Sequence, residues 1–121
     1  MKLKEVIRYV DEIKPNAFSD AVKTMWLNEC EGMVQTEVFL FAPLQIFTYE
    51  YEKDKEKHLL VEPPHDKIYA AYLAAKIDYA NGEYNKYQNT MAMFNAHFTE
   101  FTRWYATHYR PADIFARKDF I

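Results

Sequence analysis

Apolar side chains recur at helical spacing along most of the chain, beginning close to its start. Over residues 3–14 they fall on one face of a helix, at Leu3, Val6, Ile7, Val10 and Ile13. The pair Pro15-Asn16 is a strong stop, because proline cannot continue the helical hydrogen bonding. The pattern therefore predicts a first amphipathic helix that ends at Lys14.

A second helix is predicted over residues 20–40. Ser19 is a candidate N-cap, and Pro43 closes the element. Gly32 inside this helix costs about 1 kcal/mol relative to alanine, which indicates either a close approach of another helix or a kink. The apolar positions include Val22, Met25, Trp26, Met33 and Val38.

Two more helices follow, over residues 66–81 and from Tyr84 to about His108. Asn81-Gly82 separates them, and both residue types tolerate a left-handed backbone. Such a short break predicts an antiparallel helix pair. Large apolar groups recur along the last helix in steps of three and four residues, at Tyr84, Tyr87, Met91, Phe94, Phe98, Phe101 and Tyr105.

This aromatic series indicates core packing rather than a cofactor site or a platform for nucleic-acid bases. Stacking on nucleic acid usually needs flanking positive charge, and the helix offers only Lys86 and Arg103. Met93 and Trp104 lie off the series. They either widen the buried face or form a second contact surface, for example against another subunit.

Residues 44–65 lack helical periodicity. Large residues alternate at Phe47, Tyr49 and Tyr51, and a run of mixed charges follows. The segment is either a hairpin with a charged tip or a long ordered loop, which is often functional in a compact domain. The expected fold is all-α: a compact bundle of about four helices over residues 1–110, with this loop between helices two and three.

Residues 111–121 form a C-terminal arm in this interpretation. The arm carries apolar residues with little core left to join so late in the chain, namely Ile114, Phe115, Phe120 and Ile121. They either fold back over the bundle or bind a partner.

Composition narrows the class of protein. The 121 residues suit one domain, half of them are apolar, and the net charge of −3 does not favour a dedicated nucleic-acid binder. A single cysteine excludes an intrachain disulfide. The charged opening residues do not resemble a signal peptide, and no apolar run approaches the roughly 20 residues of a membrane span. We expect a soluble intracellular protein without a membrane partner.

Catalytic motifs are scarce. With two glycines and one serine, the chain cannot form a Walker loop, a dinucleotide fingerprint or a GxSxG elbow. The one Glu-x-x-His, from Glu62 to His65, is interrupted by two prolines, so we expect no metal site. Glu29 and Glu37 in the second helix are candidates for a buried general acid, although a position on the solvated face is the commoner outcome. We therefore expect no enzyme and no cofactor.

Two long phrases carry a resemblance to a known family. They read LKEVIRYVDEIKPNAFSDAVKTMWLNECEGMVQTEV and IDYANGEYNKYQNTMAMFNAHFTEFTRWY. The first resembles the opening, and the second the closing helix pair, of head–tail connector proteins of tailed phages and prophages, also called adaptor or head-completion proteins.

The resemblance implies a structural protein that self-associates into a ring beneath the portal. Such a ring joins portal to tail and continues the DNA channel, with DNA passing through without sequence-specific binding. It implies contacts with the portal and other neck or tail proteins, and a location in the host cytoplasm during assembly and then in the virion neck. In that family a loop between helices and a C-terminal arm make the ring and portal contacts, which correspond here to residues 44–65 and 110–121.

The candidate partner-binding residues lie in these regions and at the end of the last helix. They are Tyr49, Tyr51, Trp104, Ile114, Phe115, Phe120 and Ile121. An alternative function is a small helical adaptor or regulatory module that binds one cellular protein through the aromatic tail.

Overall fold

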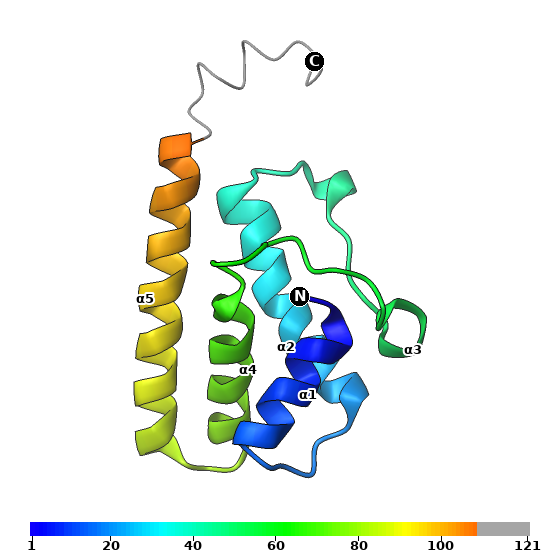
Figure 1. Cartoon of the computed structure of the whole chain (residues 1–121), viewed down its shortest axis with the longest axis vertical. Coiled ribbons are helices and arrows are strands. Elements are labelled where there is room, and N and C mark those ends of the chain that lie inside the picture. Colours follow the sequence, from blue (N-terminus) through cyan, green and yellow to red (C-terminus); the bar gives the residue numbers. More distant parts are fainter. Residues whose placement is uncertain (109–121) are drawn as a thin grey trace.

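The structure, a computed structural model, describes residues 1–108 and confirms the all-α prediction (Figure 1). No strand forms in this part of the chain, which contains one isolated bridge between Lys2 and His58. The elements are α1 (Leu3–Ile13), α2 (Asp20–Met33), the π-helical turn η1 (Val34–Val38), the 3-10 turn η2 (Pro43–Gln45), α3 (Tyr51–Asp54), α4 (Lys67–Ala80) and α5 (Tyr84–His108). The predicted arm, residues 111–121, lies outside the described residues.

Helix α4 is the centre of the bundle and contacts α1, α2 and α5 (Figure 1). Its sequence is apolar on most of its circumference, as expected for a helix covered on several sides. Helix α1 buries the face that the sequence predicts, through Leu3, Val6, Ile7 and Val10. Burying each such side chain stabilises the fold by about 1.5–3 kcal/mol.

Helices α4 and α5 form the predicted antiparallel pair. Gly82 in the connection has φ +75°, a conformation that favours glycine. The aromatic series on α5 is buried at its centre, where Phe94 and Phe101 are 3% and 2% exposed. Tyr84 is exposed and stacks edge-on with Tyr79. The prediction of a core seam is therefore right for the middle of α5 and wrong for its first turn.

Helix α2 differs from the prediction in the face that it buries. Ser19 caps it as expected, accepting a hydrogen bond from the backbone N–H of Val22 at 3.2 Å. Met25, however, is exposed, and the buried side chains of α2 include Lys23, Thr24 and Glu31. The Lys23 ammonium is paired with Asp11 of α1 at 2.7 Å, and Glu31 accepts hydrogen bonds from a long loop that lies along α2.

The helix that begins at Asp20 switches to a π-helical turn after Met33 and ends at Val38, two residues earlier than predicted. A Cβ atom added to Gly32 would meet nothing within 4 Å. The expected close approach of another helix at Gly32 is therefore wrong. Gly32 lies next to the point where the hydrogen-bonding pattern changes.

A buried carboxylate ties three helices together at one end of the bundle. Asp78 of α4, 1% exposed, accepts hydrogen bonds from the Lys14 ammonium at 2.7 Å and from the Thr90 hydroxyl at 3.1 Å. A buried charge is tolerated only when it is paired and hydrogen-bonded. Lys14 follows α1 and Thr90 belongs to α5, so this contact fixes the relative positions of α1, α4 and α5.

Candidate interaction surfaces

The segment between Val38 and Lys67 is a long ordered loop, and the hairpin alternative is wrong. The predicted charged tip forms α3, a single helical turn. Backbone N–H groups of Leu3 and Lys4 donate to the carbonyls of Lys57 and Lys55 at 3.0 and 3.1 Å. These bonds anchor the charged part of the loop to the start of α1.

Two side-chain amides, one on α2 and one on η1, hold the extended part of the loop. The amide of Asn28 donates to the Tyr49 carbonyl at 2.9 Å and accepts from the Tyr49 N–H at 2.8 Å. The amide of Gln35 makes the same pair of bonds to Phe47, both at 3.0 Å. Positions seven apart lie on one helix face, and residues two apart in an extended chain point the same way. The two amides therefore bond the loop as a neighbouring strand would.

Glu31 lies between these two amides and is 1% exposed. Its carboxylate accepts hydrogen bonds from the hydroxyls of Tyr49 and Tyr69, at 2.8 and 2.5 Å, and from the backbone N–H of Leu60 at 2.9 Å. Burial and the charge of Glu31 raise the pKa of both tyrosines above the usual range. The carboxylate thus joins α2, α4 and both halves of the loop.

The buried carboxylate of α2 is Glu31 and not either of the residues that the sequence singled out. Glu29 is exposed, where it accepts from the Tyr72 hydroxyl at 2.6 Å and pairs with Lys76 at 3.2 Å. Glu37 is also exposed. Both lie on the solvated face, the commoner outcome for such residues. Glu31 differs from these neighbours in its hydrogen-bond partners, Tyr49, Leu60 and Tyr69, which are distant in sequence.

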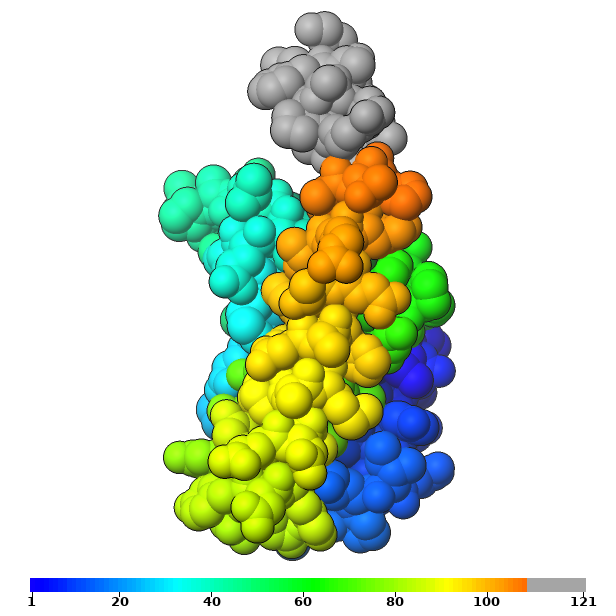
Figure 2. Space-filling model, turned by 90° about the vertical axis from the view of Figure 1, so that its left-hand side faces the viewer, coloured from blue at the N-terminus to red at the C-terminus, as the bar shows by residue number. Residues whose placement is uncertain are grey.

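Residues 40–47, which we call the apolar loop, project from the bundle beyond η1 (Figure 2). Leu44 is fully exposed and Leu40 is 75% exposed, and Ile46 and Phe47 are exposed as well. The sequence of the loop, LFAPLQIF, contains no charged residue. A contiguous apolar surface of this kind marks an interaction site more often than a solvated loop.

The apolar loop has a fixed shape. The Phe41 N–H donates to the Gln35 carbonyl at 2.8 Å. Around η2, the Ala42 N–H donates to the side chain of Gln45 at 2.7 Å, and the Gln45 N–H donates to the Ala42 carbonyl at 2.8 Å. Leu40 has φ +58°, a left-handed conformation that costs a leucine about 1–2 kcal/mol. Such a conformation persists only where the surrounding contacts impose it.

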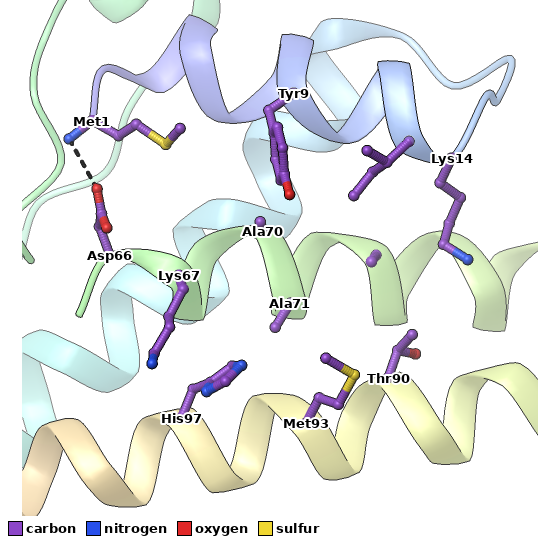
Figure 3. A pocket seen from close by; sticks show the side chains of 12 residues that line it. Met1, Tyr9, Lys14, Asp66, Lys67, Ala70, Ala71, Thr90, Met93 and His97 are labelled. Atoms are coloured by element: carbon purple, nitrogen blue, oxygen red, sulfur yellow. Dashed lines mark ion pairs between the residues drawn. The ribbon is translucent and has the colours of Figure 1, made fainter. Parts of the chain in front are cut away.

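A groove runs between α1 and α5 over the surface of α4, with a volume of about 430 Å³ (Figure 3). We call it the α1–α4–α5 groove. Ala70 and Ala71 of α4 form its floor, Tyr9 projects from α1, and Met93 and His97 project from α5. Met93, which the sequence placed off the aromatic series, is 56% exposed here. Trp104, the other residue off the series, does not line this groove, and the prediction of a second contact surface stays a prediction.

A second hollow, of about 390 Å³, lies beside the C-terminal end of α5. His65 lines it and is largely buried, with its ring 4.7 Å from that of Trp104 and 5.7 Å from that of Phe101. Glu62 is the carboxylate at this site, and it is exposed. Within residues 1–108 no group of three His, Cys, Asp or Glu side chains could hold a metal ion.

The predicted partner-binding residues fall in different environments. Tyr49 is 7% exposed and belongs to the core, because its hydroxyl is bound to Glu31. Tyr51 is half-buried beneath the ammonium of Lys55, and Trp104 is half-buried at the second hollow. Four further residues lie outside the described part of the chain, namely Ile114, Phe115, Phe120 and Ile121. Sequence reasoning missed Leu40, Leu44 and Ile46, although an uncharged apolar run after a helix end was a readable signal.

Among the described helices, none has both the length and the apolar character needed to cross a bilayer. Comparisons of this chain with protein-family models, with curated proteins and with solved structures gave no match.

Proposed function

We propose that this protein is a structural subunit of a phage or prophage head–tail connector. It would self-associate into a ring that joins the portal to the tail and continues the DNA channel. The observation that carries the proposal is the apolar loop: an uncharged, exposed surface that contacts within the subunit hold in one shape. A rigid apolar projection suits permanent assembly, because little conformational entropy is lost when it docks.

The resemblance of the two helical phrases to connector proteins supports the same function. The phrases cover α1, α2 and η1 at one end of the chain and, at the other, the last turn of α4 and most of α5. The net charge of −3 also suits a channel wall, since strong phosphate binding would retain passing DNA. We infer a structural role without catalysis or cofactor.

Mixing the protein with the portal protein of the same phage tests the proposal. Mass photometry at micromolar concentration should show portal rings that gain mass in steps of the 14.5 kDa subunit. The portal must be present, because connector subunits alone can stay monomeric. The proposal would be contradicted by a protein that stays monomeric and does not bind the portal. Portal, capsid and tail genes beside its own gene would support the proposal.

The alternative function is a small helical adaptor that binds one cellular protein through the aromatic tail. Deleting residues 111–121 and measuring pull-down from host lysate separates the two functions. Loss of a specific host protein, with normal incorporation into virions, would favour the adaptor over the connector.

A further inference from the structure

We propose that the apolar loop of one copy of this chain docks into the α1–α4–α5 groove of a neighbouring copy. The contact rests on the proposed self-association and identifies the two surfaces that make it. One protomer would carry both halves of the contact, so each copy would bind one neighbour with its loop and another with its groove.

The first half of the contact is the apolar loop. Leu44 lies in the η2 turn, and its side chain is fully exposed in the subunit. Leu40 and Ile46 are exposed on either side of it. Hydrogen bonds at Phe41 and Phe47 fix both ends of the loop to Gln35 of η1. The loop is therefore shaped before it meets a partner, which lowers the entropic cost of docking.

The second half is the groove. Its volume of about 430 Å³ lies in the range of about 300–1,000 Å³ that is usual for sites that bury a ligand. The small side chains of Ala70 and Ala71 leave space above the floor of the groove. Tyr9, Ile13 and Met93 expose apolar surface along its walls. Covering these walls would remove apolar area from water, which is the main driving force of association.

The two halves lie on opposite sides of the protomer. In Figure 2, where α5 faces the viewer, the loop beyond η1 projects on one side of α5 and α1 lies on the other. The groove opens between α1 and α5. Complementary surfaces on different faces of one subunit produce a head-to-tail contact, which closes into a ring when the rotation between neighbours permits.

Charge distinguishes a neighbouring loop from other occupants of the groove. The cations that line it are already paired, Lys14 with Asp78 at 2.7 Å and Lys67 with Glu100 at 3.8 Å. The Met1 ammonium is likewise paired with Asp66, at 3.6 Å (Figure 3). An uncharged occupant leaves these pairs intact, and the apolar loop has no charged residue. The C-terminal residues 111–121 contain four charged side chains, Asp113, Arg117, Lys118 and Asp119, which would have to be accommodated along an apolar groove.

Cross-linking between two differently tagged copies tests the contact. One copy carries Ala42→Cys in the apolar loop, and the other carries Ala71→Cys in the groove floor. Neither substitution removes a large side chain, and the native Cys30 is fully buried with a pKa raised by burial, so it should not react. A short bifunctional maleimide, added in the presence of portal protein, should give the mixed Ala42→Cys/Ala71→Cys product.

The matched control replaces Ala71→Cys by Ala21→Cys, an exposed alanine at the start of α2. We expect the loop–groove pair to react at least about tenfold more than the loop–control pair, as for a contact populated well above random encounter. Equal yields would overturn the proposal. So would a dominant product between two Ala42→Cys copies, because that indicates a symmetric contact.

A substitution at the tip of the loop gives a second, independent measurement. Leu44→Asp would place a carboxylate against the mostly apolar walls of the groove, so self-association measured by sedimentation in the presence of portal protein should weaken by about tenfold or more. The helical circular dichroism should not change, because Leu44 is fully exposed in the subunit. Unchanged association would count against the contact.

These outcomes separate the contact from the connector function. Rings that assemble on the portal without the loop–groove cross-link would overturn the contact and leave the connector function standing. The cross-link without any portal binding would support the contact and overturn the connector function. If deleting residues 111–121 makes Ala71→Cys of a monomer markedly more reactive, the C-terminal segment occupies the groove and the proposal is wrong.

Discussion

The carboxylate of Glu31 receives hydrogen bonds from two tyrosine hydroxyls and one backbone N–H, which come from three separate parts of the chain. A buried carboxylate is tolerated when its oxygens are hydrogen-bonded. Glu31 therefore joins both halves of the loop to α2 through one polar side chain.

Replacing Glu31 by alanine leaves those three donors without an acceptor. Each unsatisfied buried donor costs about 1–3 kcal/mol, so Glu31→Ala should lower the free energy of unfolding by about 3 kcal/mol or more. Urea denaturation followed by circular dichroism measures the change. Glu37→Ala, on the exposed side of η1, is the matched control and should stay within about 0.5 kcal/mol. Equal effects of the two substitutions would contradict the role of Glu31.

The same site predicts how stability depends on pH. Burial and the charge of Glu31 raise the pKa of Tyr49 and Tyr69 in the folded state, whereas an unfolded tyrosine ionises near pH 10. Above that pH the unfolded chain loses protons that the folded state keeps. The stabilisation is complete below about pH 10 and is lost as the pH rises further.

Alkaline titration should therefore show phenolate absorbance from Tyr49 and Tyr69 appearing together with the loss of helical circular dichroism. Tyr69→Phe should make the free energy of unfolding fall less steeply with pH above about 10. Tyr84→Phe, at an exposed position of α5, should not change the transition. Complete ionisation of all tyrosines with the helices intact would refute this account.

At the scale of elements, two independent side-chain amides bind the loop, Asn28 of α2 to Tyr49 and Gln35 of η1 to Phe47. Gln35→Ala should speed amide hydrogen exchange at Phe47 and leave Tyr49 protected, and Asn28→Ala should do the opposite. Each substitution acts mainly on the backbone group that it releases. Hydrogen exchange measured at each backbone N–H by NMR tests this prediction. Equal acceleration at the N–H groups of Phe47 and Tyr49 after either substitution would mean that the loop opens as one unit.

The two glycines should respond oppositely to alanine. Gly82 has a positive φ, so Gly82→Ala should destabilise the protein by about 1 kcal/mol or more. Gly32 lies in α2 with open space around a Cβ atom, so Gly32→Ala should stabilise it by about 0.5–1 kcal/mol. Thermal melting of both variants provides the comparison. Destabilisation by Gly32→Ala would show that the π-helical turn after it needs a glycine.

The helices were predictable where one periodic signal determined them. Residues 3–14 and the break at Asn81-Gly82 are examples, and the observed bounds of α1, α4 and α5 lie within about one residue of the prediction. The buried face of α2 was not predictable in this way. Lys23 is buried against Asp11 of α1, and Glu31 is buried against Tyr49 and Tyr69, and helical periodicity carries no information about such partners.

The interaction surfaces were only partly predictable for the same reason. Met93 stood out because it lies off the aromatic series, and it does line a groove. Tyr49 was predicted to bind a partner, but its hydroxyl donates a hydrogen bond to the buried carboxylate of Glu31, so its side chain lies in the core. The exposure of Leu44 follows from the fixed turn around Pro43, which is a property of the folded loop.

For the whole molecule, the described residues bring together a core of fully buried side chains. Leu3, Ile68, Leu73 and Ile77 are fully buried, and Phe101 is almost so. Deleting residues 111–121 should therefore change the free energy of unfolding by less than about 1 kcal/mol. If the protein is a connector subunit, the same deletion should weaken its binding to the portal, because the removed segment carries four large apolar residues.

Urea denaturation and mass photometry with portal protein measure the two effects on one sample. Leu44→Asp in the full chain is the matched variant, because it should also preserve the fold while acting on contacts between copies. A truncated protein that melts far below the full chain would mean that the arm is part of the core. Normal portal binding after truncation would show that the portal binds the bundle instead of the arm. The apolar loop and the α1–α4–α5 groove would then be the candidate surfaces for that contact.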